Sequence, residues 1–393
     1  MSDNTPWQSP AGGPAAAPPA SPYANAASAP PPPVGAPGWT APPKPGLIPL
    51  RPLTLGTLLA ASFQVIRRNP RPIFGFSLLL TGLIFVFTLL VVGFVSFFAF
   101  SRVSSATGAD QDAVEAGSVA TIILSALVPV VLSIVVTAIL QSIVVLEVAR
   151  GTLGEKLKLA GLWRQAKGRI GAVIGWSLLL TGAAVLALVI LSAVIGLIIA
   201  FGGTAGIVVG VILGVLAAGG ALVLSFWLGT RLCLVPSALM LERLPLRAAI
   251  ARSWSLTTGY FWKTLGIQLL VAAIVQTVAG IIGAPLQLLL GFGSVLLNPN
   301  GEGDGLIAGA VVLYVLTIIL SIVFGAIAAV IQSATTALIY IDIRMRKEGL
   351  DLELNRFVEA RQAGNSSVPD PYLQRATAEA TAPQPPSQPS PWS

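Results

Sequence analysis

Histidine is absent from this chain of 393 residues, and cysteine occurs once, as Cys233. Without histidine, the chain lacks the side chain that most often serves as a general base, a metal ligand or a sensor of pH near neutrality. One cysteine cannot form a disulfide within the chain, and Cys233 lies in an apolar run where a small buried thiol is expected. The composition therefore excludes histidine-dependent catalysis and an intrachain disulfide framework.

Charged residues are also scarce: they make up 10% of the chain, whereas 54% is hydrophobic and the mean hydropathy is +0.83. Soluble domains carry about 25% charged residues. Several apolar runs exceed the roughly 20 residues that a helix needs to cross a bilayer core. The polar segments hold no phosphate-binding loop, metal-ligand cluster or nucleophile elbow. These features predict an all-α integral membrane protein with no catalytic, cofactor or metal site.

The apolar runs predict six membrane-spanning helices. Their ranges are 73–100, 119–146, 170–200, 207–229, 264–290 and 306–339. If both termini are cytoplasmic, all of the 23 Lys and Arg residues except Arg102 lie on the cytoplasmic side. The positive-inside rule therefore predicts a multi-pass membrane protein with both termini in the cytoplasm.

The two ends of the chain differ in composition from the middle. Residues 1–53 are dominated by Pro, Ala, Ser and Gly, and residues 354–393 are polar and then Pro-rich. Such segments cannot bury enough apolar surface to offset the entropy of ordering. We therefore expect disordered tails around a membrane domain at 54–353.

The membrane domain contains one plan three times. Gly75-Phe-Ser-Leu-Leu-Leu-Thr-Gly82 recurs as Gly175-Trp-Ser-Leu-Leu-Leu-Thr-Gly182, and a weaker copy begins at Gly266. An aromatic residue stands twelve positions before the first glycine of each copy: Phe63, Trp163 and Trp254. The pattern predicts three units, about 54–150, 151–243 and 244–348, each with an amphipathic interfacial helix followed by two spans.

Aromatic residues of the interfacial helices are predicted to anchor them at the level of the lipid headgroups. The predicted anchors are Phe63, Trp163, Trp254 and Trp262. Basic residues accompany these helices, which favours contact with anionic lipid headgroups of the bilayer. Because the basic charge comes without a soluble domain, the predicted partners are the lipid bilayer and a cytoplasmic or membrane protein, and not nucleic acid.

Each even-numbered span ends in an acid that is followed by an arginine. The predicted pairs are Glu147 with Arg150, Glu242 with Arg243, and Asp342 with Arg344. A local ion pair at the membrane interface is the simpler interpretation, since exposed pairs of this kind are common and weak. Alternatively, the three acids converge on a central vestibule.

Few polar residues interrupt the spans. Arg231 either reaches the interface with its long side chain or is a buried functional residue. The span glutamines either bond between helices or line a pore; they are Gln141, Gln268, Gln276, Gln287 and Gln332. The predicted polar residues of a central cavity are Arg231, Gln141 and Gln332.

Three runs carry a resemblance to a known family: Pro236-Ser-Ala-Leu-Met-Leu-Glu242, then 246–254 and 259–266. They resemble the membrane domain of membrane-anchored glycerophosphoryl diester phosphodiesterases and related stand-alone bacterial membrane proteins. Residues 46–53 and 340–353 are similar to actinobacterial stand-alone members. The resemblance implies a membrane location. In the enzymes, hydrolysis belongs to a separate barrel domain that uses histidine and acidic residues, so no catalytic residue is carried over.

The favoured functional hypothesis is a non-enzymatic scaffold, adaptor or lipid-associated accessory factor in the plasma membrane. The alternative is a transporter or channel for a lipid or another hydrophobic solute, with a central cavity as its signature. A third hypothesis, an enzyme, would need a carboxylate site built from Glu147, Glu242 and Asp342.

Overall fold

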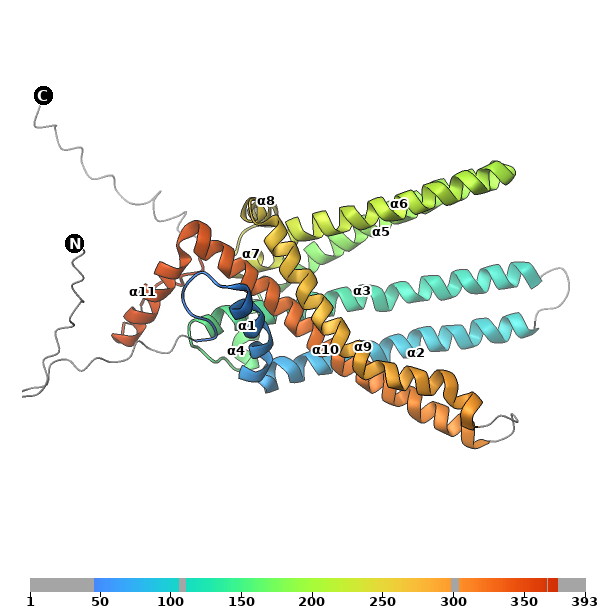
Figure 1. The fold of residues 1–393 in the computed structure, drawn as a ribbon, viewed down its shortest axis with the longest axis horizontal. Coiled ribbons are helices and arrows are strands. Elements are labelled where there is room, and N and C mark those ends of the chain that lie inside the picture. Colours follow the sequence, from blue (N-terminus) through green and yellow to red (C-terminus); the bar gives the residue numbers. More distant parts are fainter. Residues whose placement is uncertain (1–45, 106–110, 298–303, 366, 374–393) are drawn as a thin grey trace, which may run out of the picture. The chain divides into compact units, whose positions relative to one another are not determined.

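The computed structural model describes residues 46–105, 111–297, 304–365 and 367–373. Every regular element in these ranges is a helix (Figure 1). Within them, six helical segments are long and apolar enough to cross a membrane: Arg71–Ser105, Ala113–Thr152, Ile170–Phe201, Gly203–Leu241, Phe261–Leu289 and Val311–Glu348. The predicted fold class, an all-α protein with six spans, is confirmed. The disorder predicted for 1–45 and 374–393 falls outside the described residues.

The order of elements follows the predicted plan. A short amphipathic helix precedes two spans three times: α1 before α2 and α3, α4 before α5 and α6, and α8 before α9 and α10. The bounds are α1 (Leu55–Arg68), η1 (Arg71–Gly75), α2 (Phe76–Ser105), α3 (Gln111–Thr152), α4 (Leu159–Ala166), α5 (Ile170–Phe201), α6 (Gly203–Leu232), α7 (Val235–Leu241), α8 (Leu246–Thr257), α9 (Phe261–Leu297), α10 (Asp304–Glu348) and α11 (Leu350–Gln362).

Consecutive spans form hairpins: α2 packs on α3, α5 on α6, and α9 on α10 (Figure 1). The hairpins are joined mainly through α3, which contacts both α10 and α5. In the most apolar stretch of each span, at most 11% of the residues are buried by protein. Most of the span surface is therefore available to lipid chains, as expected where the solvent is hydrocarbon.

The buried core lies at one end of the spans, where α1, α4, α7, α8 and α11 pack; this end is called the basal end (Figure 1). Each amphipathic helix turns an apolar stripe inward, for example Leu58, Ala61 and Val65 of α1. Residues spaced by three or four positions share one face of a helix. Ser62 of α1 also accepts a hydrogen bond from the hydroxyl of Thr335 in α10, at 3.1 Å.

One contact recurs in all three units. A polar side chain at the junction between the amphipathic helix and the first span donates a hydrogen bond to the exit of the second span. These bonds join Asn69 to the Glu147 carboxylate (3.1 Å), Arg169 to the Leu244 carbonyl (3.1 Å) and Lys263 to the Asp342 carboxylate (2.6 Å). Asn69 and Arg169 each stand six residues before the first glycine of their repeat. The units therefore share this type of contact, although Lys263 stands three residues before its repeat glycine, inside α9, and Arg169 bonds to a carbonyl rather than to an acid.

The prediction of disorder is wrong for residues 46–53. Leu47, Ile48 and Leu53 are buried in the core. The Leu47 N–H donates to the Gly151 carbonyl at 2.8 Å, and the Leu53 N–H donates to the Asp342 carboxylate at 2.7 Å. A proline-rich segment is ordered here because its few apolar side chains and free backbone donors find partners at the basal end.

The prediction that the domain ends at 353 is also wrong, because α11 and residues 367–373 pack on the basal end. Leu350, Leu354 and Phe357 are buried at helical spacing in an otherwise polar helix. Gly349, at φ 67°, makes the bend between α10 and α11 in a conformation that favours glycine. Tyr372 is buried, with its hydroxyl bonded to Thr152 and to the Ala149 carbonyl.

Candidate functional site

The strongest concentration of charge at the basal end is centred on Glu242, whose side chain is fully buried where α7 ends. Its carboxylate accepts hydrogen bonds from Arg252 at 2.9 Å and from the Tyr340 hydroxyl, and lies 3.5 Å from Arg344. Arg252 and Arg344 also pair with Glu348, at 2.6 and 2.9 Å. Two acids and two arginines thus alternate in a balanced network that joins α7, α8 and α10.

This network stabilises the charged form of Arg252. Burial alone would lower the pKa of Arg252, but its hydrogen bonds to Glu348 and Glu242 raise that pKa above the ordinary value. The guanidinium therefore remains charged at every physiological pH, and it keeps the opposing carboxylates compensated.

Asp342 is the centre of a second network, in α10. Its buried carboxylate pairs with Lys263 at 2.6 Å and with Arg346 at 3.0 Å, and accepts the Leu53 N–H. Arg346 also donates to the Leu53 carbonyl at 2.6 Å. The network ties the segment before α1 to α9 and α10.

Glu147 differs from the other two acids. It is buried in α3 and accepts a hydrogen bond from Asn69, while its Oε2 has no hydrogen-bond partner. Arg150, one turn later, pairs with Asp370 at 2.5 Å and more loosely with Glu155 at 3.9 Å.

None of the three predicted acid–arginine pairs forms. Arg243 is exposed, at φ 54°, and Arg344 turns to Glu242 and Glu348. Neighbours one or two positions apart on a helix point in different directions, which separates Glu242 from Arg243 and Asp342 from Arg344. The buried acids pair instead with residues of other elements or, for Asp342, also with Arg346 one turn later on α10. In the described ranges, no three His, Cys, Asp or Glu side chains gather as a metal site. Glu147, Glu242 and Asp342 therefore do not form a shared three-carboxylate metal site.

The predicted anchors differ in their surroundings. Phe63 is half-buried against the core, whereas Trp163, Trp254 and Trp262 expose 41, 39 and 80% of their surface. Trp254 packs edge-on against Trp227, with ring centroids 5.4 Å apart. Exposure at the basal end fits an interfacial role for the three tryptophans, whose depth in a bilayer stays a prediction.

Arg231 is held beside these aromatic residues. Its guanidinium carbon lies 5.1 Å from the Trp254 ring centroid and 5.6 Å from that of Phe261. Its Nη1 donates to the Thr258 hydroxyl at 3.0 Å, while its Nε is buried with no hydrogen-bond partner. Cation–π contacts of this kind stabilise an arginine at the junction of α6, α8 and α9.

A cavity of about 450 Å³ lies where the three hairpins meet. Two of its three predicted polar residues, Gln141 and Gln332, line it, but Arg231 does not. Successive helical residues point about 100° apart, and since Leu232 and Cys233 face the cavity, Arg231 turns towards α8. The full lining is Ser133, Ile134, Thr137, Gln141, Trp176, Ser177, Leu180, Thr181, Gly229, Leu232, Cys233, Pro236, Gln268, Gln332 and Thr336.

Equivalent positions of the three units meet in this cavity. The residues six positions before the exit acids Glu147, Glu242 and Asp342 all line it; they are Gln141, Pro236 and Thr336. The residues ten positions before those acids line it as well; they are Thr137, Leu232 and Gln332. The cavity is therefore the common meeting place of the three second spans.

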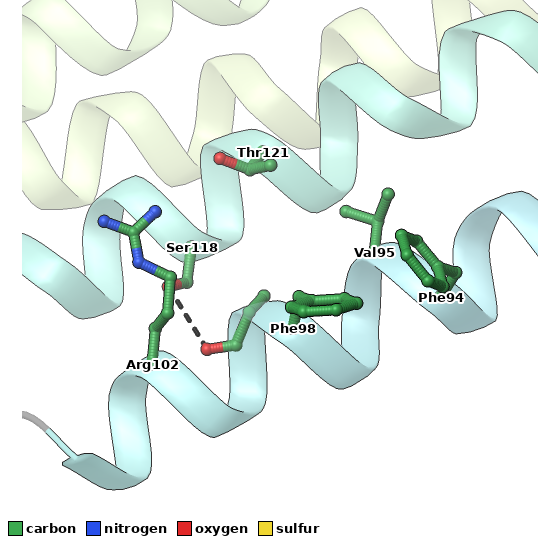
Figure 2. A pocket seen from close by; sticks show the side chains of 7 residues that line it. Phe94, Val95, Phe98, Arg102, Ser118 and Thr121 are labelled. Atoms are coloured by element: carbon green, nitrogen blue, oxygen red, sulfur yellow. Dashed lines mark hydrogen bonds between the residues drawn. The ribbon is translucent and has the colours of Figure 1, made fainter.

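A smaller hollow of about 180 Å³ lies between α2 and α3, near the ends that are joined by the loop after Ser105 (Figure 2). Phe94 and Phe98 of α2 form one wall, Ser118 of α3 lies opposite, and Arg102 extends towards α3. The Ser118 hydroxyl donates to the Ala99 carbonyl at 3.5 Å. The hollow is shallow and mainly apolar.

Sequence reasoning missed the residues that compensate the buried acids: Asn69, Arg252, Lys263, Arg346 and Glu348. Asn69, Arg252 and Lys263 pair with residues far away in sequence or on a neighbouring helix. Arg346 and Glu348 stand four positions after Asp342 and Arg344 on α10, a spacing that the sequence does display. Another signal was available, since Asn69 and Arg169 hold the same position relative to the repeat glycine.

Comparison with known proteins gives a family match for the second half of the chain. No curated protein and no solved structure matches the chain. Residues 209–365 match the family model described as the membrane domain of glycerophosphoryl diester phosphodiesterase. This segment runs from within α6 to the end of α11 and includes both charge networks around Glu242 and Asp342. The resemblance drawn from the sequence is confirmed, since residues 209–365 of this integral membrane protein are similar to the membrane domain of glycerophosphoryl diester phosphodiesterase.

Proposed function

We propose that this protein is a non-enzymatic scaffold or adaptor of the plasma membrane, which holds a protein partner at the cytoplasmic face. The observation that carries the proposal is a set of exposed cations at the basal end, the basic rim. Its members are Arg67, Arg71, Lys158, Arg164, Lys167, Arg243 and Arg247. Within the described part of the chain, none of them makes an ion pair or a side-chain hydrogen bond.

The basic rim contrasts with the buried cations of the same end. Arg252, Arg344 and Arg346 are all used in networks that hold the helices together. The rim cations stabilise no internal contact, so their charge is available to ligands. Each Lys or Arg near an anionic leaflet contributes about 1 kcal/mol of attraction. The rim would set the basal end against anionic headgroups and an acidic surface of the partner.

The charge asymmetry supports a cytoplasmic location for the basal end, because Arg102 alone among the Lys and Arg residues lies in a segment assigned to the other side. A non-enzymatic role is supported by the match to a membrane domain, with no match to a catalytic domain, and by the lack of histidine.

The test is in-cell chemical cross-linking of the full chain, followed by mass spectrometry. The charge-reversal variant Arg243→Glu/Arg247→Glu removes two rim cations, and Arg102→Glu is the matched control at the far end of α2. We expect one partner to be captured by the wild type and by Arg102→Glu, and its yield to fall severalfold in the rim variant. Equal yields from both variants would contradict the role of the rim.

The cavity between the hairpins favours a second candidate function, transport of a lipid or another hydrophobic solute. Gln141 and Gln332 would contact the solute, whereas Arg231, which lies outside the cavity, would not. The test is movement of a fluorescent lipid between leaflets of vesicles that contain the purified chain. Movement faster than in empty vesicles, and slowed by Gln332→Leu, would favour transport over the scaffold.

A further inference from the structure

The cavity where the hairpins meet offers hydrogen bonds without charge. Gln141, Gln268 and Gln332 approach from α3, α9 and α10, and hydroxyl groups of Ser and Thr residues lie among them. Its lining contains no Asp, Glu, Lys or Arg. An anionic or cationic group would enter it without a compensating partner, which is costly in an interior of low dielectric constant. The lining therefore selects for uncharged polar groups.

Two of the amides are free to bind a ligand. Gln268 has a hydrogen bond with Cys233, but the side-chain amides of Gln141 and Gln332 bond to no described residue. Each amide presents two donors and an acceptor. An occupant that both donates and accepts hydrogen bonds can pair with these amides, and such pairing is favourable where the occupant keeps water out.

The place of the cavity constrains the rest of the ligand. Gln141 lies six residues and Gln332 ten residues before the exit acids of their spans, which corresponds to depths of about 9 and 15 Å along the helices. Trp176, Leu180 and Leu232 form apolar parts of the wall, and the cavity is not closed on all sides. A ligand that reaches this depth beside lipid-facing spans needs an apolar portion of its own.

We infer that the cavity binds the headgroup of an uncharged, hydroxyl-rich lipid, such as a diacylglycerol that carries a single sugar. A volume of about 450 Å³ lies in the range of small-molecule sites, roughly 300–1,000 Å³. The sugar hydroxyls satisfy Gln141 and Gln332, and the acyl chains lie along the exposed apolar spans. Anionic phospholipids remain at the basic rim, outside the cavity.

The test is native mass spectrometry of the full chain released from phosphatidylcholine nanodiscs that contain equal amounts of monoglucosyl diacylglycerol and phosphatidylglycerol. We expect the glucosyl lipid to be retained in preference to phosphatidylglycerol. Retention should fall about tenfold in Gln141→Leu/Gln332→Leu, which corresponds to about 1.4 kcal/mol. Gln276→Leu, on an exposed face of α9, is the control and should retain the lipid. Preference for phosphatidylglycerol, or equal retention by the double variant, would overturn the inference.

A second measurement keeps the test independent of the variants. Cys233, the only cysteine, lines the cavity and reports on its occupancy. We expect the glucosyl lipid to slow alkylation of Cys233 by N-ethylmaleimide severalfold in the wild type, and free glucose to leave the rate unchanged. Equal protection by glucose would assign the site to a soluble sugar, and no protection by the lipid would leave only water as occupant; either result overturns the lipid assignment. The inference goes beyond the proposed scaffold and uses none of the rim cations, so loss of lipid retention and loss of partner capture are distinguishable.

Discussion

Replacement of Glu242 by glutamine tests the buried charge network most sharply. The glutamine keeps the shape of the side chain but removes the negative charge that Arg252 meets at 2.9 Å and Arg344 at 3.5 Å. Loss of one partner from a buried pair costs about 3–5 kcal/mol. Both arginines keep Glu348, and Arg252 is 16% exposed, so the lower end of this range applies. We expect a loss of about 3 kcal/mol.

The assay is thermal unfolding of the full chain in nanodiscs, monitored by circular dichroism. With roughly 2 °C for each kcal/mol in a domain of this size, the melting temperature should fall by about 6 °C. Arg243→Gln is the matched control, because Arg243 is adjacent in sequence, exposed and absent from the network. Surface changes of this kind alter stability by no more than about 0.5 kcal/mol. If Arg243→Gln lowered the melting temperature as much as Glu242→Gln, the network would be refuted and a local pair of Glu242 with Arg243 would be supported.

Three further changes separate the packed segments from their neighbours. In Gly46→Ala, the added Cβ would lie 2.2 Å from the Gly151 carbonyl oxygen, so the melting temperature should fall. In Gly56→Ala, the Cβ enters open space in a helix and should raise stability by about 0.5–1 kcal/mol. A melting temperature that falls in Gly56→Ala but not in Gly46→Ala would count against the packing of residues 46–53. Tyr372→Ala empties a buried aromatic site and should cost about 3 kcal/mol of stability. The loss should appear as increased proteolysis after α11. Unchanged proteolysis would show that Tyr372 does not fix this segment to the basal end. Trp254→Ala removes the ring that contacts Trp227 and Arg231 and should cost about 2 kcal/mol of stability. The control Trp7→Ala should leave the melting temperature unchanged. Equal changes of melting temperature in the two variants would argue against anchoring by Trp254.

The spans and amphipathic helices could be predicted because their signals are local. Runs of apolar residues define α2, α3, α5, α6, α9 and α10. The spacing of Leu58 and Val65, or of Leu162 and Ala166, defines a buried helical face. The repeated glycines and aromatics also predicted a plan that the order of elements follows.

The packed ends and the charge partners could not be predicted in the same way. α11 is mainly polar, so the average composition of this segment hides its three buried apolar residues, Leu350, Leu354 and Phe357. Lys263 meets Asp342 across 79 residues, a contact that depends on how the hairpins dock. Arg243 follows its acid by one position and Arg344 by two, yet Arg344 is buried and Arg243 is exposed. Such choices are decided by tertiary packing rather than by spacing.

Part of the cavity was within reach of sequence reasoning. The depth of Gln141 and Gln332 marked them as polar residues of the spans, and both line the cavity. Aligning the three units on Glu147, Glu242 and Asp342 would also have brought Thr137 and Thr336 into the set. Arg231 was misplaced because its direction around α6 depends on the aromatic residues of α8 and α9.

The central claim, that the basal end holds a protein partner at the cytoplasmic face, is tested most directly by native mass spectrometry of the chain purified gently with its own lipids. Lipids and proteins are then identified together, in the wild type and in Arg243→Glu/Arg247→Glu. The account predicts a stoichiometric protein partner with the wild type that is lost with the rim variant. A wild-type protein that carries lipid and no protein partner would contradict the scaffold and favour transport.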